Sequence, residues 1–143
     1  MSFLYLGSVS TGTMRTEDLI PTFASVLADL DAKKASELAT EYANWEDDQE
    51  SANWYFDALS DALNDAAPDY VHFGANEGDG ADYGFWIHWE SLEDDCRDDA
   101  VRKIADLADW PADTENLDAV LLVNDHGNAT LYSTDREELW ACV

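Results

Sequence analysis

Three histidines, His72, His88 and His126, carry the side chains best suited to bind a metal ion or to transfer a proton near neutral pH. His72 and His88 lie in two segments that predict neighbouring strands, so their rings could face each other. His126 follows Asp125 in a predicted turn. An enzyme that uses His72, His88 and Asp82 is therefore one hypothesis. No partner nucleophile is evident, and the motifs of serine hydrolases, zinc hydrolases and kinases are absent, so we predict no catalytic residue and no enzyme.

The glycine-rich segment 74–84 is the second place with recognisable chemistry. It holds four oxygen donors of the kind that calcium prefers: Asn76, Glu77, Asp79 and Asp82. Their spacing departs from that of an EF-hand loop, and the segment lacks the Lys and the Ser or Thr of a phosphate-binding loop. We therefore expect a hairpin connection whose glycines supply positive φ angles, and we predict no metal site and no cofactor.

The cysteines and the first residues indicate the cellular compartment. Cys96 and Cys142 lack metal-ligand spacing, so we expect reduced thiols that are buried as small apolar side chains. The N-terminus has no basic region, and its apolar run is too short for a signal peptide or a membrane span. These features predict a cytoplasmic protein.

Acidic side chains dominate the composition, with 32 Asp and Glu against 7 Lys and Arg and a formal net charge of −25 on 143 residues. Residues 1–40 carry a net charge of −2, residues 41–118 carry −20 and residues 119–143 carry −3. Nucleic acids are excluded as partners because phosphate contacts require Lys and Arg, and anionic membrane surfaces would repel the chain. The charge therefore predicts a basic protein as the partner.

The clearest periodicity predicts one long amphipathic helix, or two, from about Lys34 to Asn64. Its apolar stripe consists of Leu38, Tyr42, Trp45, Gln49, Ala52, Phe56, Leu59 and Leu63. The opposite face of this helix is mainly acidic. Its residues fall within an arc of about 80° around the helix axis: Asp47, Glu50, Trp54, Asp57, Asp61 and Asp65. An ordinary solvated face is the alternative interpretation, but like charges at these spacings cost helix stability, and no Lys or Arg lies between residues 35 and 96. We therefore predict that this face binds the partner, with Trp54 as its aromatic anchor.

A second acidic helix is predicted from an N-cap at Ser91 to about Ala108. Its inward residues would be Leu92, Cys96, Ala100, Ile104 and Leu107. Its first turns would contain five carboxylates: Glu93, Asp94, Asp95, Asp98 and Asp99. The helix dipole favours carboxylates at that end, but five exceed what a cap needs. We therefore predict that these five also contact the partner.

The remaining signals predict an α+β fold in a single domain, residues 1–143. A loop or loose strand at residues 8–13 precedes a helix that opens near Thr16, with the helical part covering 16–66. The mixed part, 69–143, contains strands at 70–73 and 83–89 and a three-stranded meander at 119–123, 129–132 and 139–143. Together these predict three helices and a roughly five-stranded, mainly antiparallel sheet with helices on one face.

In charge, size and helical acidic rows such as Asp47–Asp65, the chain resembles the acidic DNA-mimic proteins by which phages and mobile elements block restriction enzymes, CRISPR effectors and other DNA-binding host proteins. The segments 78–86 and 125–132 are similar to those of small phage-encoded proteins of unassigned role. The resemblance implies a phage origin and, in the DNA mimics, a host nuclease or CRISPR effector as the target.

Two functional hypotheses follow. The first is a phage-type inhibitor that occupies the nucleic-acid-binding surface of a host defence protein in the host cytoplasm, with its carboxylates in place of phosphates. The second is a salt-adapted or metal-binding accessory protein without that role, because Asp outnumbers Glu by 21 to 11 and Lys is scarce. The first requires carboxylates gathered in a patch, whereas the second predicts carboxylates spread over the whole surface.

Overall fold

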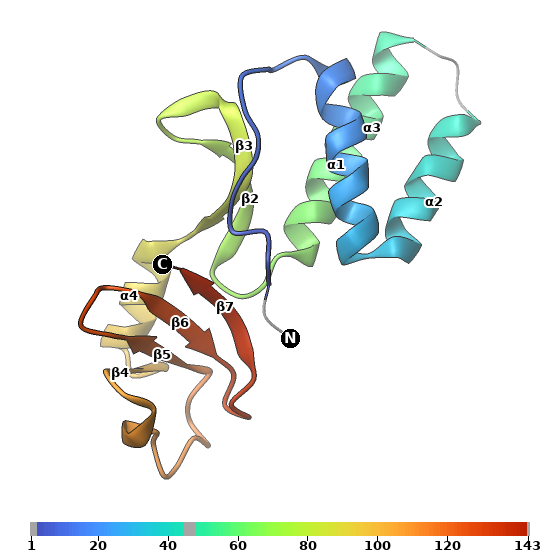
Figure 1. Ribbon diagram of the computed structural model, residues 1–143. Helices are drawn as coiled ribbons and strands as arrows, with labels where there is room; N and C mark the ends of the chain where they lie inside the picture. The colour runs from blue at the N-terminus through green and yellow to red at the C-terminus, as the bar shows by residue number, and fades with distance from the viewer. Residues whose placement is uncertain (1–2, 45–47, 143) are drawn as a thin grey trace. The chain divides into compact units, whose positions relative to one another are not determined.

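The computed structural model describes residues 3–44 and 48–142, and this part of the chain forms an α+β fold with four α-helices and two sheets (Figure 1). The predicted fold class is confirmed. The sheets contain seven strands instead of the expected five, arranged as three and four strands. The additional strands, β1 and β4, are short and acquire their pairing partners from distant parts of the sequence.

The chain divides into two compact units. We call Gly7–Ala67 with Val71–Trp86 the helical unit, and Met1–Leu6, Pro68–Tyr70 and Ile87–Val143 together the β-rich unit. The chain passes between the units four times, so neither unit is one continuous segment. The single domain remains a prediction.

Three helices and a three-stranded sheet build the helical unit. Its elements are β1 (Gly7–Ser10), α1 (Thr16–Leu30), α2 (Ala32–Ala43), α3 (Gln49–Ala66), β2 (Val71–Asn76) and β3 (Asp79–Ile87). The helix start near Thr16 is confirmed, and the expected long helix is two helices, α2 and α3. Each of these two begins with an aspartate cap: Asp31 accepts the Lys34 N–H at 3.1 Å, and Asp48 accepts the Ser51 N–H at 2.8 Å.

Phe23 on α1 is the centre of the core of the helical unit. The residue is fully buried, and its ring contacts Phe56 on α3, Phe73 on β2 and Tyr83 on β3 at centroid distances of 5.4, 4.9 and 5.5 Å. Helix α1 packs against both α2 and α3, and α3 also packs against β2. One aromatic side chain therefore joins the helices to the sheet.

The buried face of α3 is turned relative to the predicted stripe. Its buried residues are Ser51, Tyr55, Leu59, Ala62 and Leu63. Gln49, placed on the stripe by the sequence pattern, is exposed and donates to Asn53 at 2.9 Å. The difference arises because α3 packs against both α1 and β2, so two contacts decide which side is covered.

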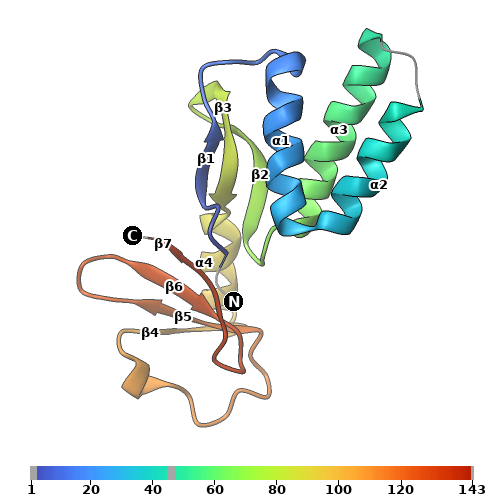
Figure 2. The same cartoon turned by 45° about the vertical axis from the view of Figure 1, so that its right-hand side comes forward.

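The three-stranded sheet has the order β1-β3-β2, with β1 antiparallel to β3 (Figure 2). The expected glycine-rich loop is reduced to a turn at residues 77–78 between β2 and β3, and the other glycines of 74–84 lie in strands. None of these glycines has a positive φ angle, so that expectation is wrong. Gly84 serves close packing instead: a Cβ atom there would lie 2.2 Å from the carbonyl oxygen of Gly7 in β1.

The β-rich unit consists of α4 (Trp89–Arg97), a short 3-10 helix η1 (Leu107–Asp109), and the strands β4 (Val101–Ile104), β5 (Ala119–Val123), β6 (Ala129–Tyr132) and β7 (Glu138–Cys142). Strand β4 pairs parallel with β5, whereas the β5–β6 and β6–β7 pairs are antiparallel. The meander β5-β6-β7 confirms the prediction. Trp140 on β7 is fully buried, and its indole N–H donates to the Asp69 carbonyl at 2.9 Å.

The second acidic helix ends at Arg97, about ten residues before the predicted end. Asp99 takes a left-handed conformation with φ 62°, and the N–H groups of Asp99 and Ala100 donate to the carbonyls of Cys96 and Asp95. This is a Schellman motif, with Asp at the position that usually holds Gly. Residues 101–104 then pair with β5 as a strand, because tertiary pairing outweighs the helical spacing of the apolar residues.

We predict that Gly84→Ala destabilises the protein by about 2 kcal/mol or more, because the new methyl group must push β1 away from β3. Gly74→Ala in β2 is the matched control, since a Cβ atom at Gly74 meets nothing within 4 Å. Denaturant unfolding measures both variants, and neither changes the net charge. Equal stability of the two variants would contradict the close approach of β1 to β3.

We predict that Asp99→Gly stabilises the β-rich unit by about 1 kcal/mol, because glycine adopts the left-handed conformation without steric cost and the change removes a carboxylate from a helix C-terminus. Asp98→Gly is the control, because it removes the same charge at the preceding residue, and Asp98 has a φ of −86°. Denaturant unfolding should give a higher free energy of unfolding for Asp99→Gly than for Asp98→Gly. The reverse order would refute the Schellman geometry.

Candidate partner-binding surface

The predicted acidic face of α3 is exposed in the structure. Glu50, Asp57, Asp61 and Asp65 are all exposed, and we call these four residues the carboxylate row. They lie on the side of α3 opposite its buried residues. Asp47, the fifth carboxylate of the prediction, lies outside the described residues.

The carboxylate row concentrates acidic side chains relative to the surface as a whole. The solvent-accessible surface is 8663 Å², so an even spread would give roughly 350 Å² per net charge, whereas a duplex offers about 100 Å² per phosphate. The row extends over about 22 Å of helix, a strip of about 220 Å² at a width of about 10 Å, or about 55 Å² per carboxylate. The α3 face therefore reaches a local density that the surface as a whole does not.

Trp54 lies on the same side of α3 as the carboxylate row and is half-buried. Its ring is nearly parallel to that of Tyr55, with the centroids 6.5 Å apart, and Tyr55 in turn stacks on Tyr42 of α2 at 4.4 Å. Burial, followed by the neighbouring Tyr42, raises the pKa of Tyr55 above its ordinary value. Trp54 therefore combines a partly exposed ring with a supported position beside the carboxylates.

The five carboxylates predicted for the second helix are not equivalent in the structure. Glu93 is exposed on α4, whereas Asp94 and Asp95 are half-buried. Arg97 forms an ion pair with Asp94. Asp98 and Asp99 lie at the C-terminal end of α4, so the expectation that they occupy its first turns is wrong and the helix dipole disfavours them there. The helix begins at Trp89 with His88 as its cap, three residues before the predicted cap at Ser91.

Asp95 has a partner that the sequence does not suggest. The Tyr70 hydroxyl donates a hydrogen bond to the carboxylate of Asp95, which lies 25 positions later in the sequence. Burial, then this hydrogen bond, and then the charges of Asp95, Asp118 and Asp69 raise the pKa of Tyr70. Tyr70 also has a φ of 65°, which is rare for a bulky residue, and its carbonyl accepts the His88 N–H at 2.7 Å. Asp95 is therefore part of the internal structure of the β-rich unit.

Acidic residues occur on both units in nearly equal number. The helical unit contains 16 acidic and 3 basic residues, and the β-rich unit contains 16 acidic and 4 basic ones. None of the acidic residues in the described part of the chain is buried. The excess charge of the middle of the sequence is thus shared between two units, and the carboxylate row is a local concentration within a generally acidic surface.

The structure places the three histidines on different elements. His72 lies on β2 in the helical unit. His88 lies beyond the end of β3 and caps α4, with its Nδ1 atom 2.7 Å from Ser91 Oγ. The expectation that both rings lie on paired strands is therefore wrong for His88. His126 is exposed in the turn between β5 and β6.

Asn76 and Asp82 of the glycine-rich segment lie within reach of each other. Asp82 accepts a long hydrogen bond from the Asn76 side chain at 3.4 Å. Within residues 3–44 and 48–142, no group of three or more His, Cys, Asp or Glu side chains is placed to hold a metal ion. Cys96 and Cys142 form no disulfide and are half-buried, not fully buried as expected, and burial raises the pKa of the Cys96 thiol.

None of the helices in the described part of the chain is long and apolar enough to cross a lipid bilayer. Comparison of the chain with protein-family models, with curated proteins and with solved structures gives no match. The exposed chemistry of the two units is therefore the basis for a functional proposal.

Proposed function

We propose that this protein is a non-enzymatic inhibitor that occupies the nucleic-acid-binding surface of a basic host defence protein. The observation that carries the proposal is the carboxylate row on α3, with four exposed acidic side chains along one helix. No Lys or Arg occurs between residues 35 and 96, so α3 itself carries none. The row is thus an ordered line of negative charge available to another molecule.

Lys and Arg side chains that bind phosphates would recognise this row through the same charge-assisted hydrogen bonds. Long-range attraction by a net charge of −25 would accelerate association, and salt would weaken it. Trp54 would supply apolar contact area at the same face, where aromatic residues contribute strongly to binding energy. These properties suit a competitor of DNA or RNA.

The carboxylates near α4 differ in how available they are to a partner. Glu93 and Asp98 are exposed, whereas Asp94 and Asp95 already have partners in Arg97 and Tyr70. Asp99 is exposed next to Asp98. We therefore assign the main contact to α3 and a supporting contact to Glu93, Asp98 and Asp99.

The resemblance to phage-encoded DNA mimics indicates which partner to expect. The target would be a nuclease or CRISPR effector, and the site of action would be the host cytoplasm. A nucleic acid is not a partner in this proposal, because the seven Lys and Arg residues cannot neutralise a phosphate backbone against 32 carboxylates.

A salt-adapted accessory protein is the second candidate function. The near-equal acidic excess of the two units favours it, since adaptation to salt spreads carboxylates over a whole surface. The local density on α3 favours the inhibitor instead. Binding and stability measurements separate the two.

We predict that a variant with the whole row neutralised (Glu50→Gln, Asp57→Asn, Asp61→Asn and Asp65→Asn) binds the partner about 100-fold more weakly, at about 0.7 kcal/mol per carboxylate. The partner is a protein recovered by affinity purification from host lysate, and duplex DNA should displace the inhibitor from it. Fluorescence anisotropy at rising salt concentration measures the affinity.

The control for the row variant carries the same chemical changes at four exposed, scattered positions: Glu37→Gln, Asp79→Asn, Asp125→Asn and Asp135→Asn. Both variants have the same net charge. The control should lose affinity by less than about fivefold, because it removes only long-range attraction. Equal losses, or a complex that neither DNA nor salt weakens, would refute the proposed role of the row.

We predict that the purified protein is folded at about 0.1 M KCl and gains stability only gradually at higher salt, as charge repulsion is screened. Far-UV circular dichroism and denaturant unfolding across a KCl series measure this. A protein that folds only in molar KCl would favour the second candidate.

A further inference from the structure

A hollow of about 680 Å³ lies in the helical unit, at the end where α1 and α3 begin and α2 finishes. This volume is typical of sites that hold a ligand or a few side chains. The residues of its lining that matter here are Met14, Arg15, Glu17, Tyr42, Asp48 and Ala52. The hollow thus lies next to the first turn of α3, the helix that carries the carboxylate row.

The lining offers both apolar and acidic groups. Met14 is 65% exposed and lines the hollow. Tyr42 stacks on Tyr55 with one face of its ring and also lines the hollow. Glu17 and Asp48 contribute carboxylates, and the hydrogen bond from the Ser51 backbone lowers the pKa of Asp48. An occupant should therefore combine an apolar stem with a positive charge.

The charge balance at this end of the helical unit is negative. The two helix N-termini contribute roughly half a positive charge each. Against them stand Glu17 and Asp18 in the first turn of α1, and Asp48 and Glu50 at the start of α3. Arg15 is the basic residue of the lining, and it forms an ion pair with Glu17. A cationic occupant is therefore favoured over an anionic one.

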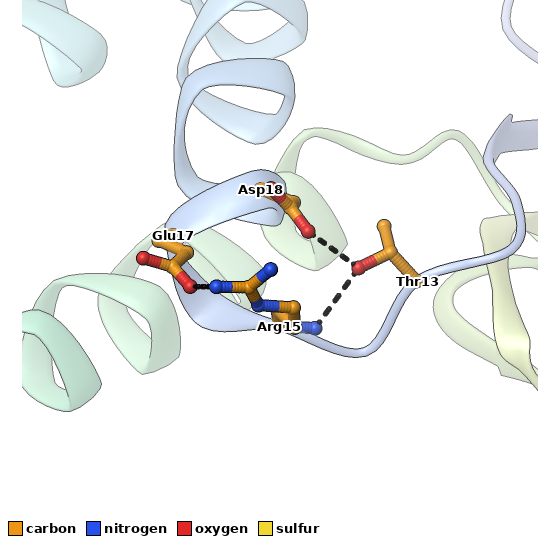
Figure 3. A network of polar contacts seen from close by, with 4 residues as sticks. All are labelled: Thr13, Arg15, Glu17 and Asp18. Carbon is orange, nitrogen blue, oxygen red and sulfur yellow. Dashed lines mark hydrogen bonds and ion pairs between the residues drawn. The ribbon is translucent and has the colours of Figure 1, made fainter.

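Figure 3 shows how the α1 side of this end is organised. The Thr13 hydroxyl donates to Asp18 at 2.8 Å and accepts the Arg15 N–H at 3.2 Å. The Arg15 guanidinium extends to Glu17. These contacts link the acidic side chains of the first turn of α1 to Thr13 and Arg15.

We infer that this hollow receives an arginine side chain, flanked by an apolar residue, from the basic protein partner. The inference rests on the proposed function and names the feature by which a partner would distinguish this protein from DNA. A phosphate backbone offers charge but no apolar hollow. The hollow therefore adds specificity to a charge-based attraction.

Arginine fits the lining better than lysine does. Its planar guanidinium stacks on aromatic rings such as that of Tyr42 and donates bidentate hydrogen bonds to carboxylates such as that of Asp48. Its aliphatic stem, together with the flanking apolar residue, packs against Met14 and Ala52. Lysine would carry the same charge without the flat surface.

The test uses two synthetic, fluorescein-labelled peptides of twelve residues and equal charge, built from alternating Lys and Gly. One carries a central Leu-Arg-Leu triplet, and the other carries Gly-Lys-Gly in its place. We expect the Leu-Arg-Leu peptide to bind about tenfold more tightly to the full-length protein at low salt. Fluorescence anisotropy measures both affinities.

Two pairs of variants test whether the hollow causes the preference for the Leu-Arg-Leu peptide. Asp48→Asn and Asp31→Asn each neutralise an aspartate helix cap with a residue that still caps, but only Asp48 lines the hollow. Ala52→Leu fills the hollow, whereas Ala39→Leu adds the same group to an exposed position on α2. We expect Asp48→Asn to weaken binding of the Leu-Arg-Leu peptide about fivefold, and Asp31→Asn less than about twofold. Ala52→Leu should abolish the preference between the peptides, and Ala39→Leu should leave it unchanged.

The outcomes separate this inference from the proposed function. Three results would each refute the binding of arginine in the hollow: equal binding of the two peptides, equal effects of Asp48→Asn and Asp31→Asn, or a preference that survives Ala52→Leu. The carboxylate row would then remain as the proposed contact. Failure of both peptides to bind at low salt would overturn the proposed function and the inference together.

Discussion

Electrostatic self-repulsion is the constraint on which the rest of this structure depends. A net charge of −25 opposes any compact arrangement, and burial of apolar surface must outweigh it. The fold meets this by burying none of the described acidic residues completely, while it buries large rings such as Phe23 and Trp140 in full. Several aspartates also take local structural roles, as the caps at Asp31 and Asp48 show.

The same constraint leads to the proposed function. Repulsion along the carboxylate row is a cost that the folded protein carries alone, and a cationic partner would relieve it. The row is supported by the fold because α3 packs against α1 and β2. Charge and rigidity thus come from two faces of one helix, and both are needed for a surface that competes with a nucleic acid.

Predictions from the sequence succeeded where contacts are local and failed where they are distant. The start of α1, the exposed face of α3 and the meander β5-β6-β7 were all predictable from spacing and turn residues. Strand β4 was not, because its apolar residues also fit a helix and only pairing with β5 decides between the two. The glycines of 74–84 were assigned to turn formation, although Gly84 serves the approach of β1.

The sequence by itself determined the sign and amount of charge and the helical periodicity, because these depend on residue type and on neighbours within one or two helical turns. Only the tertiary structure decided that Asp95 is engaged by Tyr70 and that the first turns of α1 and α3 enclose a hollow with Tyr42. It also decided how the charge divides between two units. These features join residues far apart in the chain, and local spacing contains no information about which distant segments meet.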